Sequence, residues 1–152
     1  MQQSEFALNL GDYVVTKQRA HIACYGLGSC VGLFLFDRVN KISAAAHIVL
    51  SDDLEKHTTL NAKTAFEKLL EEIEKIGGSK NTLRAKLVGG ANLFNSGFNT
   101  GKKNTDTLLK LLRDNKIYLA AKDVGGCKSR TAKFNTINGE LSVSSQNQIY
   151  AI

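Results

Sequence analysis

The sequence predicts an α+β fold, and three observations support this prediction. Short runs of strand-forming residues dominate the first third of the chain. A strongly amphipathic segment follows near the middle, and short strand-forming runs return towards the end. Because strands and helices form separate groups instead of alternating regularly, we expect a layered α+β arrangement rather than a doubly wound sheet.

The first third contains four strand-like runs, at residues 13–15, 21–25, 31–36 and 42–50. A polar turn at residues 37–40 separates the last two runs. Apolar and β-branched runs bounded by turn residues are typical of strands. We therefore expect consecutive strands that are mostly joined as hairpins.

Two segments predict helices. Apolar residues recur every three or four positions between residues 59 and 76, which places them on one helical face. The pair Gly77-Gly78 offers the left-handed conformation that commonly ends a helix. A second helix is expected from about Asn104 to Asp114, with leucines on one face and an asparagine as its N-cap.

The remaining strands surround these helices. Residues 83–88 predict a strand between the two helices, and residues 117–121, 131–136 and 140–144 predict three more near the end. Asn138-Gly139 is a typical hairpin turn between the last two.

Length and composition indicate one globular domain spanning residues 1–152. Hydrophobic residues make up 43% of the chain, yet no apolar stretch is long enough to cross a bilayer. The first residues lack the basic start and apolar run of a signal peptide. Three cysteines without a CxxC pair make a poor disulfide framework. We therefore expect a cytoplasmic protein with reduced thiols and no membrane insertion.

The formal net charge of +6 could attract nucleic acid, an anionic membrane or an acidic protein surface. The basic residues are scattered, and no strip of base-stacking aromatic residues accompanies them. We therefore expect an acidic protein partner and no nucleic acid. A basic surface without a partner is an equally good interpretation of the charge alone.

The sharpest local feature is the segment Gly-Leu-Gly-Ser-Cys-Val-Gly at residues 26–32, where Cys30 follows a glycine-rich turn and precedes an apolar strand. Glycines permit unusual backbone angles and close approach of a ligand. A turn through Gly28 and Ser29 can also direct backbone N–H groups at one point, as an oxyanion requires. The alternative is that Cys30 is a small buried hydrophobic residue beside an ordinary turn.

A nucleophilic thiol needs a base, and histidine is its usual partner. His47 lies in an otherwise small and apolar strand, where an unpartnered imidazole is costly to bury. Its alternative role is a core histidine bonded to a backbone carbonyl. His21 and His57 have settings typical of surface residues. If residues 31–36 and 42–50 form neighbouring strands, Cys30 and His47 can meet.

Two further glycine pairs follow strands, Gly89-Gly90 and Gly125-Gly126. Neither belongs to a phosphate-binding loop, because the lysine and hydroxyl of such loops are missing. We interpret both as tight turns that line the same cleft, together with Asn92. Zinc binding by Cys24, Cys30 and Cys127 is a weaker alternative, since the short paired spacings of structural zinc sites are absent.

Six motifs in register resemble the CheD family of chemoreceptor glutamine deamidases. They are Gly26-Leu27-Gly28-Ser29-Cys30-Val31, Ala46-His47-Ile48-Val49-Leu50, Thr64-Ala65, Gly89-Gly90-Ala91-Asn92-Leu93-Phe94, Gly101 with Asn104, and Asp123-Val124-Gly125-Gly126 followed by Arg130. The resemblance implies a cysteine hydrolase that converts glutamines of bacterial chemotaxis receptors to glutamate, with Cys30 and His47 catalytic and no cofactor. It also implies two packed β-sheets flanked by helices, similar to toxin-type deamidases.

The resemblance implies a third catalytic position six residues before the cysteine, where the family has threonine and this chain has Cys24. A thiol is a weaker hydrogen-bonding group than a hydroxyl, so this position is the clearest departure from the family pattern. The expected partners are the cytoplasmic region of a chemotaxis receptor, as substrate, and a CheC-type phosphatase, as regulator. Two alternatives stay open: a non-catalytic binding partner of such a phosphatase, and a cysteine peptidase or transglutaminase-like acyl transferase.

Overall fold

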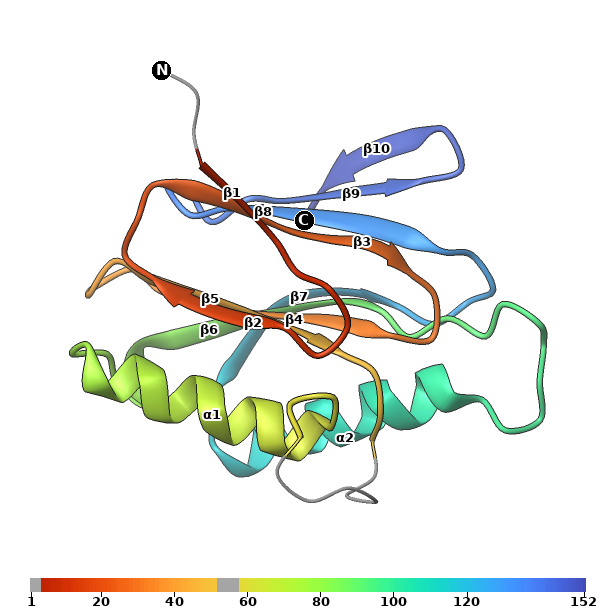
Figure 1. The fold of residues 1–152 in the computed structure, drawn as a ribbon, viewed down its shortest axis with the longest axis horizontal. Coiled ribbons are helices and arrows are strands. Elements are labelled where there is room, and N and C mark those ends of the chain that lie inside the picture. Colours follow the sequence, from red (N-terminus) through yellow and green to blue (C-terminus); the bar gives the residue numbers. More distant parts are fainter. Residues whose placement is uncertain (1–3, 52–57) are drawn as a thin grey trace.

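Two five-stranded sheets pack face to face, and two helices cover the outer face of one of them (Figure 1). The computed structural model describes residues 4–51 and 58–152. Sheet 1 has the order β1 (Ser4–Ala7), β3 (Ala20–Leu27), β8 (Arg130–Asn135), β9 (Leu141–Ser145) and β10 (Gln148–Ala151). Sheet 2 has the order β2 (Tyr13–Thr16), β5 (Ile42–Ile48), β4 (Val31–Asp37), β6 (Leu83–Gly89) and β7 (Tyr118–Val124). The helices are α1 (Ala62–Lys75) and α2 (Thr100–Asp114), and a short 3₁₀ turn, η1 (Lys80–Thr82), precedes β6.

This arrangement confirms the predicted α+β sandwich of two sheets flanked by helices. Both helices lie on sheet 2, so the layers run sheet 1, sheet 2, helices (Figure 1). Strand pairing is mixed: β1 with β3 and β6 with β7 are parallel, and the other neighbours are antiparallel.

The prediction that the first strands form consecutive hairpins is wrong except for β4 and β5. The chain changes sheet between β2 and β3 and again between β3 and β4. The reason lies in burial, because every residue of β4 and β5 is buried and these strands therefore need a layer on each face. Sheet 1 supplies one of these layers and the helices supply the other.

Two apolar cores result from the alternation of side chains along β4. Val31, Leu33 and Leu35 point into the core between sheet 2 and the helices. Phe34 and Phe36 point into the core between the two sheets. On β5, Ala45 belongs to this same inter-sheet core, so the alternate residues Ser43 and His47 face sheet 1 as well.

The helices begin and end close to the predicted positions, with one correction. Helix α1 stops where expected, with Gly77 at φ +97° and the Gly78 N–H donating to the Ile73 carbonyl at 2.9 Å. Helix α2 begins four residues before the predicted start. Its N-cap is Asn99, whose side chain accepts from the Lys102 N–H, whereas Asn104 is buried inside the helix. Among the described residues, neither helix is long and apolar enough to span a bilayer.

Phe134 on β8 is the aromatic residue that joins the two sheets. It is fully buried and its ring lies 5.8 Å from that of Phe34 and 5.4 Å from that of Phe36, measured between centroids. These contacts cross from sheet 1 to sheet 2, so the inter-sheet core depends on this side chain.

Replacing Phe134 with alanine is therefore expected to lower the free energy of unfolding by about 3–5 kcal/mol, because a large cavity would open between the sheets. Urea denaturation followed by circular dichroism measures the change. Phe94→Ala is the matched control, since Phe94 is 90% exposed and its loss should cost no more than about 0.5 kcal/mol. Equal effects of the two substitutions would contradict this account of the core.

Candidate active site

Cys30 lies in the three-residue connection, Gly28-Ser29-Cys30, that carries the chain from β3 in sheet 1 to β4 in sheet 2. Its side chain is partly exposed and packs against the inter-sheet core. All three carbonyl groups of the connection accept hydrogen bonds, Gly28 from the Ala91 N–H at 2.8 Å, Ser29 from the Asn104 side chain at 3.0 Å and Cys30 from the Gly90 N–H at 2.9 Å. The connection is thus held rigidly at the end of sheet 2.

The N–H groups of the connection are not used in the same way. In the described part of the chain, neither the Ser29 N–H nor the Cys30 N–H donates to a carbonyl or side chain of another residue. Two backbone donors beside a cysteine sulfur are the feature that stabilises an oxyanion in cysteine hydrolases. The predicted oxyanion turn at Gly28 and Ser29 is compatible with this geometry.

Gly89 and Gly90 pack against the connection that contains Cys30. Gly89 has φ +116°, and a Cβ added there would lie 2.3 Å from the Cys30 carbonyl oxygen. Gly90 has φ +65°, and a Cβ there would lie 2.2 Å from the Thr105 Oγ1. Both glycines are buried, so they do not line an open cleft. Their lack of a side chain instead lets the backbone of Cys30 pack closely against the end of β6.

The other predicted cleft residues lie around this support. Gly125 donates its N–H to the Gly89 carbonyl at 2.9 Å, and the Gly126 carbonyl accepts from the Asn92 N–H at 2.8 Å. Asn92 also lines a small hollow of about 180 Å³ together with Ser29 and the loop up to Thr100. Asn92 thus borders a hollow beside Ser29, whereas Gly89, Gly125 and Gly126 make backbone hydrogen bonds.

His47 is 3% exposed and lies opposite Gly32 in the antiparallel pairing of β4 and β5. Its Nδ1 is 3.0 Å from the Leu8 carbonyl oxygen. A carbonyl can only accept, so this hydrogen bond requires the ring proton on Nδ1 and leaves the lone pair of a neutral ring on Nε2. Among the described residues, no group forms a hydrogen bond with this buried Nε2.

Leu8 therefore orients His47. The Leu8 N–H donates to the Ala23 carbonyl on β3 at 2.9 Å, which ties the segment before β2 to sheet 1 and places the Leu8 carbonyl over the imidazole. The alternative interpretation, a core histidine bonded to a backbone carbonyl, explains the hydrogen bond of Nδ1 but does not explain the unpartnered Nε2. An unpartnered buried nitrogen costs about 1–3 kcal/mol, and such groups are retained where they have a use in chemistry.

The predicted adjacency of the strands that carry Cys30 and His47 is confirmed, because β4 and β5 are direct neighbours. Cys30 is two residues before Gly32, so it is the diagonal neighbour of His47 on the inter-sheet face. Diagonal neighbours in antiparallel sheets lie about 7–8 Å apart at their Cα atoms. No Sγ–Nε2 hydrogen bond joins the described side chains of the two residues. Catalytic hydrogen bonds often shorten only when the substrate is bound.

Cys24 approaches the same point from sheet 1. It is fully buried on β3, and its Sγ lies 3.5 Å from the position of a Cβ added to Gly32. The Phe34 ring lies closer to that position, at 2.9 Å, so the space left by the missing side chain at Gly32 is occupied by Phe34 and bordered by Cys24. The structure therefore brings Cys24, Cys30 and His47 together around Gly32, although they come from three different strands or connections.

Both thiols remain protonated at neutral pH. Burial, and to a smaller extent the nearby Cys30, raise the pKa of Cys24 from 9.0 to about 12. Burial also raises the pKa of Cys30, against the opposing effect of its own backbone N–H. A thiol in this state needs a base to become a nucleophile, and His47 Nε2 is an unpartnered nitrogen on the same face of the sheet.

Asn104 and Leu8 contribute to the site in ways that the sequence analysis missed. The buried Asn104 side chain donates to the Ser29 carbonyl at 3.0 Å and to the Val49 carbonyl at 2.9 Å, so it joins the Cys30 connection to the end of β5. A polar residue on the apolar face of a predicted helix was the signal for this role. The Leu8 contribution is a backbone carbonyl, which leaves no signal in a sequence.

Arg130 and Asp123 connect the ends of the two sheets next to this site. The Arg130 Nε lies 3.4 Å from the Asp123 carboxylate, and its Nη1 donates to the Gly89 carbonyl at 3.3 Å. The Tyr150 hydroxyl donates to Asp123 as well. These contacts hold the β7–β8 connection against the support of Cys30.

The remaining histidines and Cys127 lie apart from this site or outside the described residues. His21 is half-buried on β3, and His57 falls outside the described ranges. Cys127 is exposed in the β7–β8 connection. Within residues 4–51 and 58–152, no three His, Cys, Asp or Glu side chains gather as metal ligands, so the zinc alternative gains no support.

A glycine-turn cysteine and a buried histidine at one end of a two-sheet α+β sandwich define a candidate cysteine–histidine site. The family model described as CheD chemotactic sensory transduction matches residues 50–145. The chain is 39% identical over 139 residues to the chemoreceptor glutamine deamidase CheD of Thermotoga maritima, covering 90% of this chain and 88% of the relative. It is 37% identical to the protein of the same name from Halalkalibacterium halodurans, covering 93% of each. This chain belongs to the CheD family.

A solved structure supports the fold independently of sequence. The hypothetical protein YfiH of Bacillus licheniformis matches with a TM-score of 0.50 at 13% identity, covering 76% of this chain. The match covers 51% of that protein, so the present chain spans about half its length. This likeness concerns the fold alone.

The stability of the protein is expected to fall above pH 9 because of Cys24. Its folded-state pKa of about 12 exceeds the ordinary 9.0, so its contribution to stability is complete below pH 9 and is lost as the pH rises towards 12. Relative to Cys24→Val, the protein should lose on the order of 1 kcal/mol per pH unit across this window. Urea denaturation at several pH values under reducing conditions measures the difference, and identical pH profiles for the two proteins would contradict it.

Proposed function

We propose that this protein is a chemoreceptor glutamine deamidase that uses Cys30 as nucleophile and His47 as general base and acid. The observation that carries the proposal is the buried Nε2 of His47, which has a free lone pair on the face that it shares with Cys30. The relatives named above carry the name of this activity.

The reaction begins when Nε2 of His47 takes the proton of the Cys30 thiol and the sulfur attacks the carboxamide carbon of a glutamine. The developing oxyanion is held by the N–H groups of Ser29 and Cys30. The imidazolium then gives its proton to the departing ammonia, and a thioester remains. His47 next removes a proton from water as the water oxygen attacks the thioester carbon. The C–S bond then breaks, the imidazolium returns this proton to the sulfur of Cys30, and glutamate and the free thiol are released. The sequence of steps uses no metal or organic cofactor.

The Leu8 carbonyl determines that Nε2 of His47, and not Nδ1, exchanges protons with the reactants. Its hydrogen bond with Nδ1 fixes the neutral tautomer and also stabilises the imidazolium that forms during the reaction. Because burial raises the pKa of Cys30, proton transfer to His47 accompanies attack and no stored thiolate is required.

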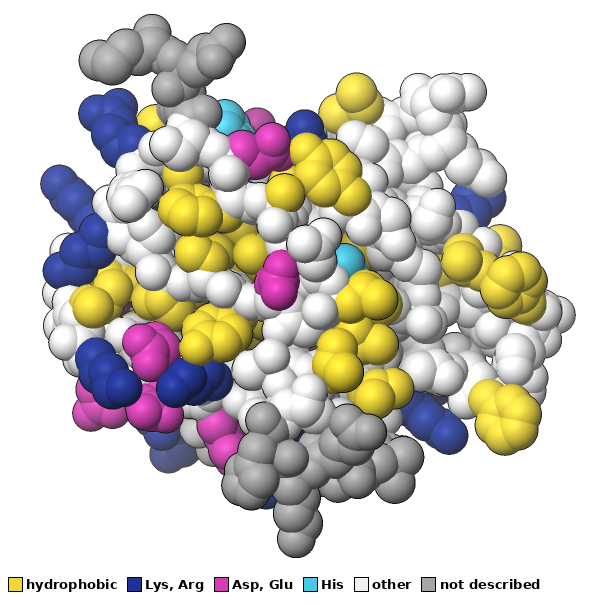
Figure 2. Space-filling model, in the orientation of Figure 1, with side chains coloured by type: hydrophobic (Ala, Val, Ile, Leu, Met, Phe, Trp, Pro, Cys, Tyr) yellow, Lys and Arg dark blue, Asp and Glu magenta, His cyan; other side chains and the backbone are white. Residues whose placement is uncertain are grey.

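The substrate in this proposal is the cytoplasmic region of a chemotaxis receptor, and the protein therefore acts in the cytoplasm as a single deamidase domain. The net charge of +6 favours the approach of an acidic receptor surface. Hydrophobic side chains project at the right edge of Figure 2, where Figure 1 has the loop between β6 and α2. Phe94 and Phe98 of this loop are 90% and 80% exposed, beside the hollow that Ser29 lines. They offer an apolar contact for a receptor helix.

Cys30→Ala is expected to abolish conversion of receptor glutamines to glutamate, because the thioester can no longer form. The purified protein is incubated with a receptor cytoplasmic fragment, and peptide mass spectrometry detects the conversion. Cys127→Ala is the matched control, since it removes an exposed cysteine of the same chain and should retain full activity. Conversion by Cys30→Ala at the rate of the unmodified protein would refute the mechanism.

Cys24 is the proposed third member of the site, in the position where the family resemblance implies threonine. A neutral thiol beside Gly32 donates only a weak hydrogen bond, so it orients the reacting groups less firmly than a hydroxyl.

We expect Cys24→Thr to increase the turnover number several-fold with little change in KM, because the hydroxyl improves orientation without altering substrate contacts. Cys24→Val is the control that matches threonine in shape and lacks the hydroxyl. If the threonine and valine variants show the same turnover number, position 24 has no orienting role.

One alternative has an observation in its favour. Cys30 and His47 are not hydrogen-bonded to each other, and Cys24 stands in the third position. A protein with weakened chemistry could serve as a binding partner of a CheC-type phosphatase, which we propose as the regulator in either case. The mass-spectrometric experiment separates the two functions, since the binding partner alone predicts no glutamine conversion by the unmodified protein. A peptidase or acyl transferase would instead cleave the fragment or couple an amine.

A further inference from the structure

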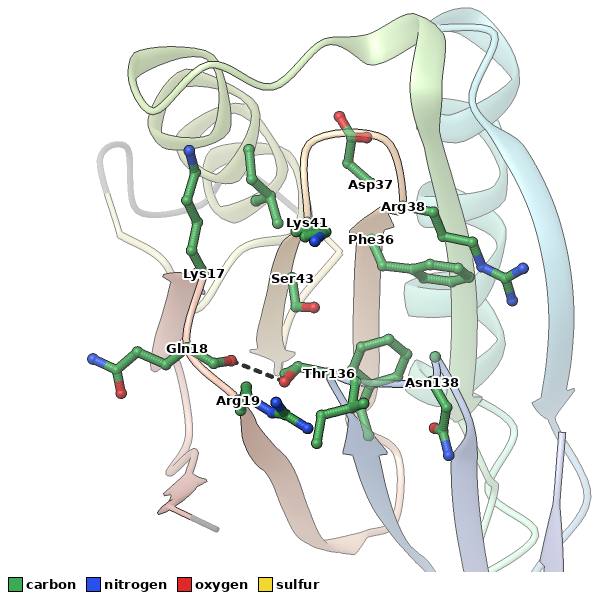
Figure 3. Close-up of a pocket in the computed structure, with 14 residues that line it drawn as sticks. Lys17, Gln18, Arg19, Phe36, Asp37, Arg38, Lys41, Ser43, Thr136 and Asn138 are labelled. Carbon is green, nitrogen blue, oxygen red and sulfur yellow. Dashed lines mark hydrogen bonds between the residues drawn. The ribbon is translucent and has the colours of Figure 1, made fainter.

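A hollow lies at the opposite end of β4 and β5 from Cys30, and Figure 3 shows the side chains that line it. It has a volume of about 560 Å³ and lies between the connection at residues 17–19, the β4–β5 hairpin and the turn at residues 136–139. Cys30 precedes the first residue of β4, whereas Phe36 and Asp37 at the far end of that strand line the hollow. The hollow is therefore separate from the candidate active site.

Positive charge dominates this hollow. Its lining contains the cations Lys17, Arg19, Arg38 and Lys41. None of these four forms an ion pair with any carboxylate in the described ranges. Dark blue side chains accordingly gather along the left edge of Figure 2, where Figure 1 has the β4–β5 hairpin and the β2–β3 connection.

Asp37 is the carboxylate among the lining residues, and its oxygens are already engaged. They accept from the Asn40 side chain at 2.7 Å and from the Thr82 hydroxyl at 2.6 Å. Burial opposes ionisation of this group, yet these hydrogen bonds hold the pKa of Asp37 below its ordinary value. The Asp37 carboxylate is therefore already bound by the hairpin and η1, and the four cations remain without a carboxylate partner among the described residues, although the Arg38 guanidinium lies 5.9 Å from the centroid of the Phe36 ring.

Ser43 adds a buried polar group that faces the hollow. It is 5% exposed, and Figure 3 shows its hydroxyl turned towards the space between the labelled side chains. Its hydroxyl has no hydrogen-bond partner among the residues that the structure describes. The neighbouring Thr136 hydroxyl differs, because it accepts from the Ala20 N–H and donates to the Gln18 carbonyl. Because its oxygen is not among the fully buried polar atoms without a partner, the Ser43 hydroxyl is open to the hollow, where it can hydrogen-bond with a ligand atom.

The walls of the hollow are apolar next to this hydroxyl. Phe36, Phe134, Ile42 and Ile137 line it, and the first three are buried. Small-molecule sites combine such walls with a few polar groups, in volumes of about 300–1,000 Å³. A ligand here can bury an apolar or planar part against the walls while its anionic part meets the cations at the rim.

We propose that this hollow binds a small organic phosphate, such as a nucleoside monophosphate. A phosphate monoester carries a charge of about −1.5 to −2 at neutral pH, which suits a group of unpaired cations. The Arg19 and Arg38 guanidinium groups can each offer two parallel N–H donors to phosphate oxygens, and the lysines add point charges. The Ser43 hydroxyl lies deeper, within reach of a small group and out of reach of a flat protein surface.

Calorimetric titration of the full chain with AMP at low salt tests the proposal. We expect saturable binding of AMP, weaker binding of inorganic phosphate and no binding of adenosine. Arg38→Gln should weaken AMP binding by about 10-fold or more, and Ser43→Ala by about 3–10-fold, as expected for charged and neutral hydrogen bonds. Lys63→Gln is the control, because it removes an exposed lysine of α1 outside the hollow and should leave binding unchanged.

Three results would overturn the proposal: no saturable binding of AMP, equal binding by the Arg38 and Lys63 variants, or binding of a glutamate-rich peptide in preference to AMP. The last result would make the hollow part of a protein-docking surface. Cys30→Ala should bind AMP like the unmodified protein, so failure of the deamidase proposal and failure of this one are distinguishable.

Discussion

The antiparallel pair of β4 and β5 is the constraint on which the rest of the structure depends. Both strands are buried on both faces, so sheet 1 must cover one side and the helices the other. Their register places His47 opposite Gly32, two residues after Cys30. The same register brings Phe36 and Asp37 beside Ser43 and Ile42 at the far end. One pair of strands thus positions both the cysteine–histidine site and the basic hollow.

The candidate active site departs from the rule that buried polar groups are paired at two atoms of the described residues, His47 Nε2 and Asn104 Oδ1, and the first of these has a chemical use in the proposed function. His47 satisfies Nδ1 with the Leu8 carbonyl and leaves Nε2 without a hydrogen bond in the described structure. A thiol whose pKa is raised by burial lies on the same face. Neither group is reactive alone at neutral pH, since the thiol is protonated and the imidazole has nothing to deprotonate. In the proposed function they act together as a base and a latent nucleophile, which is the arrangement that hydrolysis of a carboxamide requires.

Rigidity around Cys30 comes from backbone contacts. The three carbonyls of the connection accept hydrogen bonds from Gly90 and Ala91, directly after β6, and from Asn104, while two N–H groups remain available. Gly89 and Gly90 make this possible, because side chains there would collide with the Cys30 carbonyl and with Thr105. The connection is therefore already ordered in the folded protein, so substrate binding does not have to supply the free energy of ordering it.

Periodicity and turn residues were sufficient to predict most helices and strands, because those signals are local. They predicted α1 to its glycine end, the β4–β5 hairpin, and Cys30 and His47 as a candidate pair on neighbouring strands. The short edge strands β1 and β10 were missed, since few residues carry too little pattern. The start of α2 was also misplaced, because Asn99 adopts a left-handed cap and the contacts of Gly101 with Gly90 and Ala91 draw the first turn into the core.

Long-range contacts decided the rest. Four features join residues distant in sequence. They are the assignment of β3 and β4 to different sheets, the Leu8 carbonyl on His47, the position of Cys24 beside Gly32, and the four cations that line one hollow. The sequence by itself determined the local conformations and the chemical character of Cys30 and His47. Only the tertiary structure decided their common face and their partners, because hydrogen bonds, burial and shifted pKa values depend on which strands pack together.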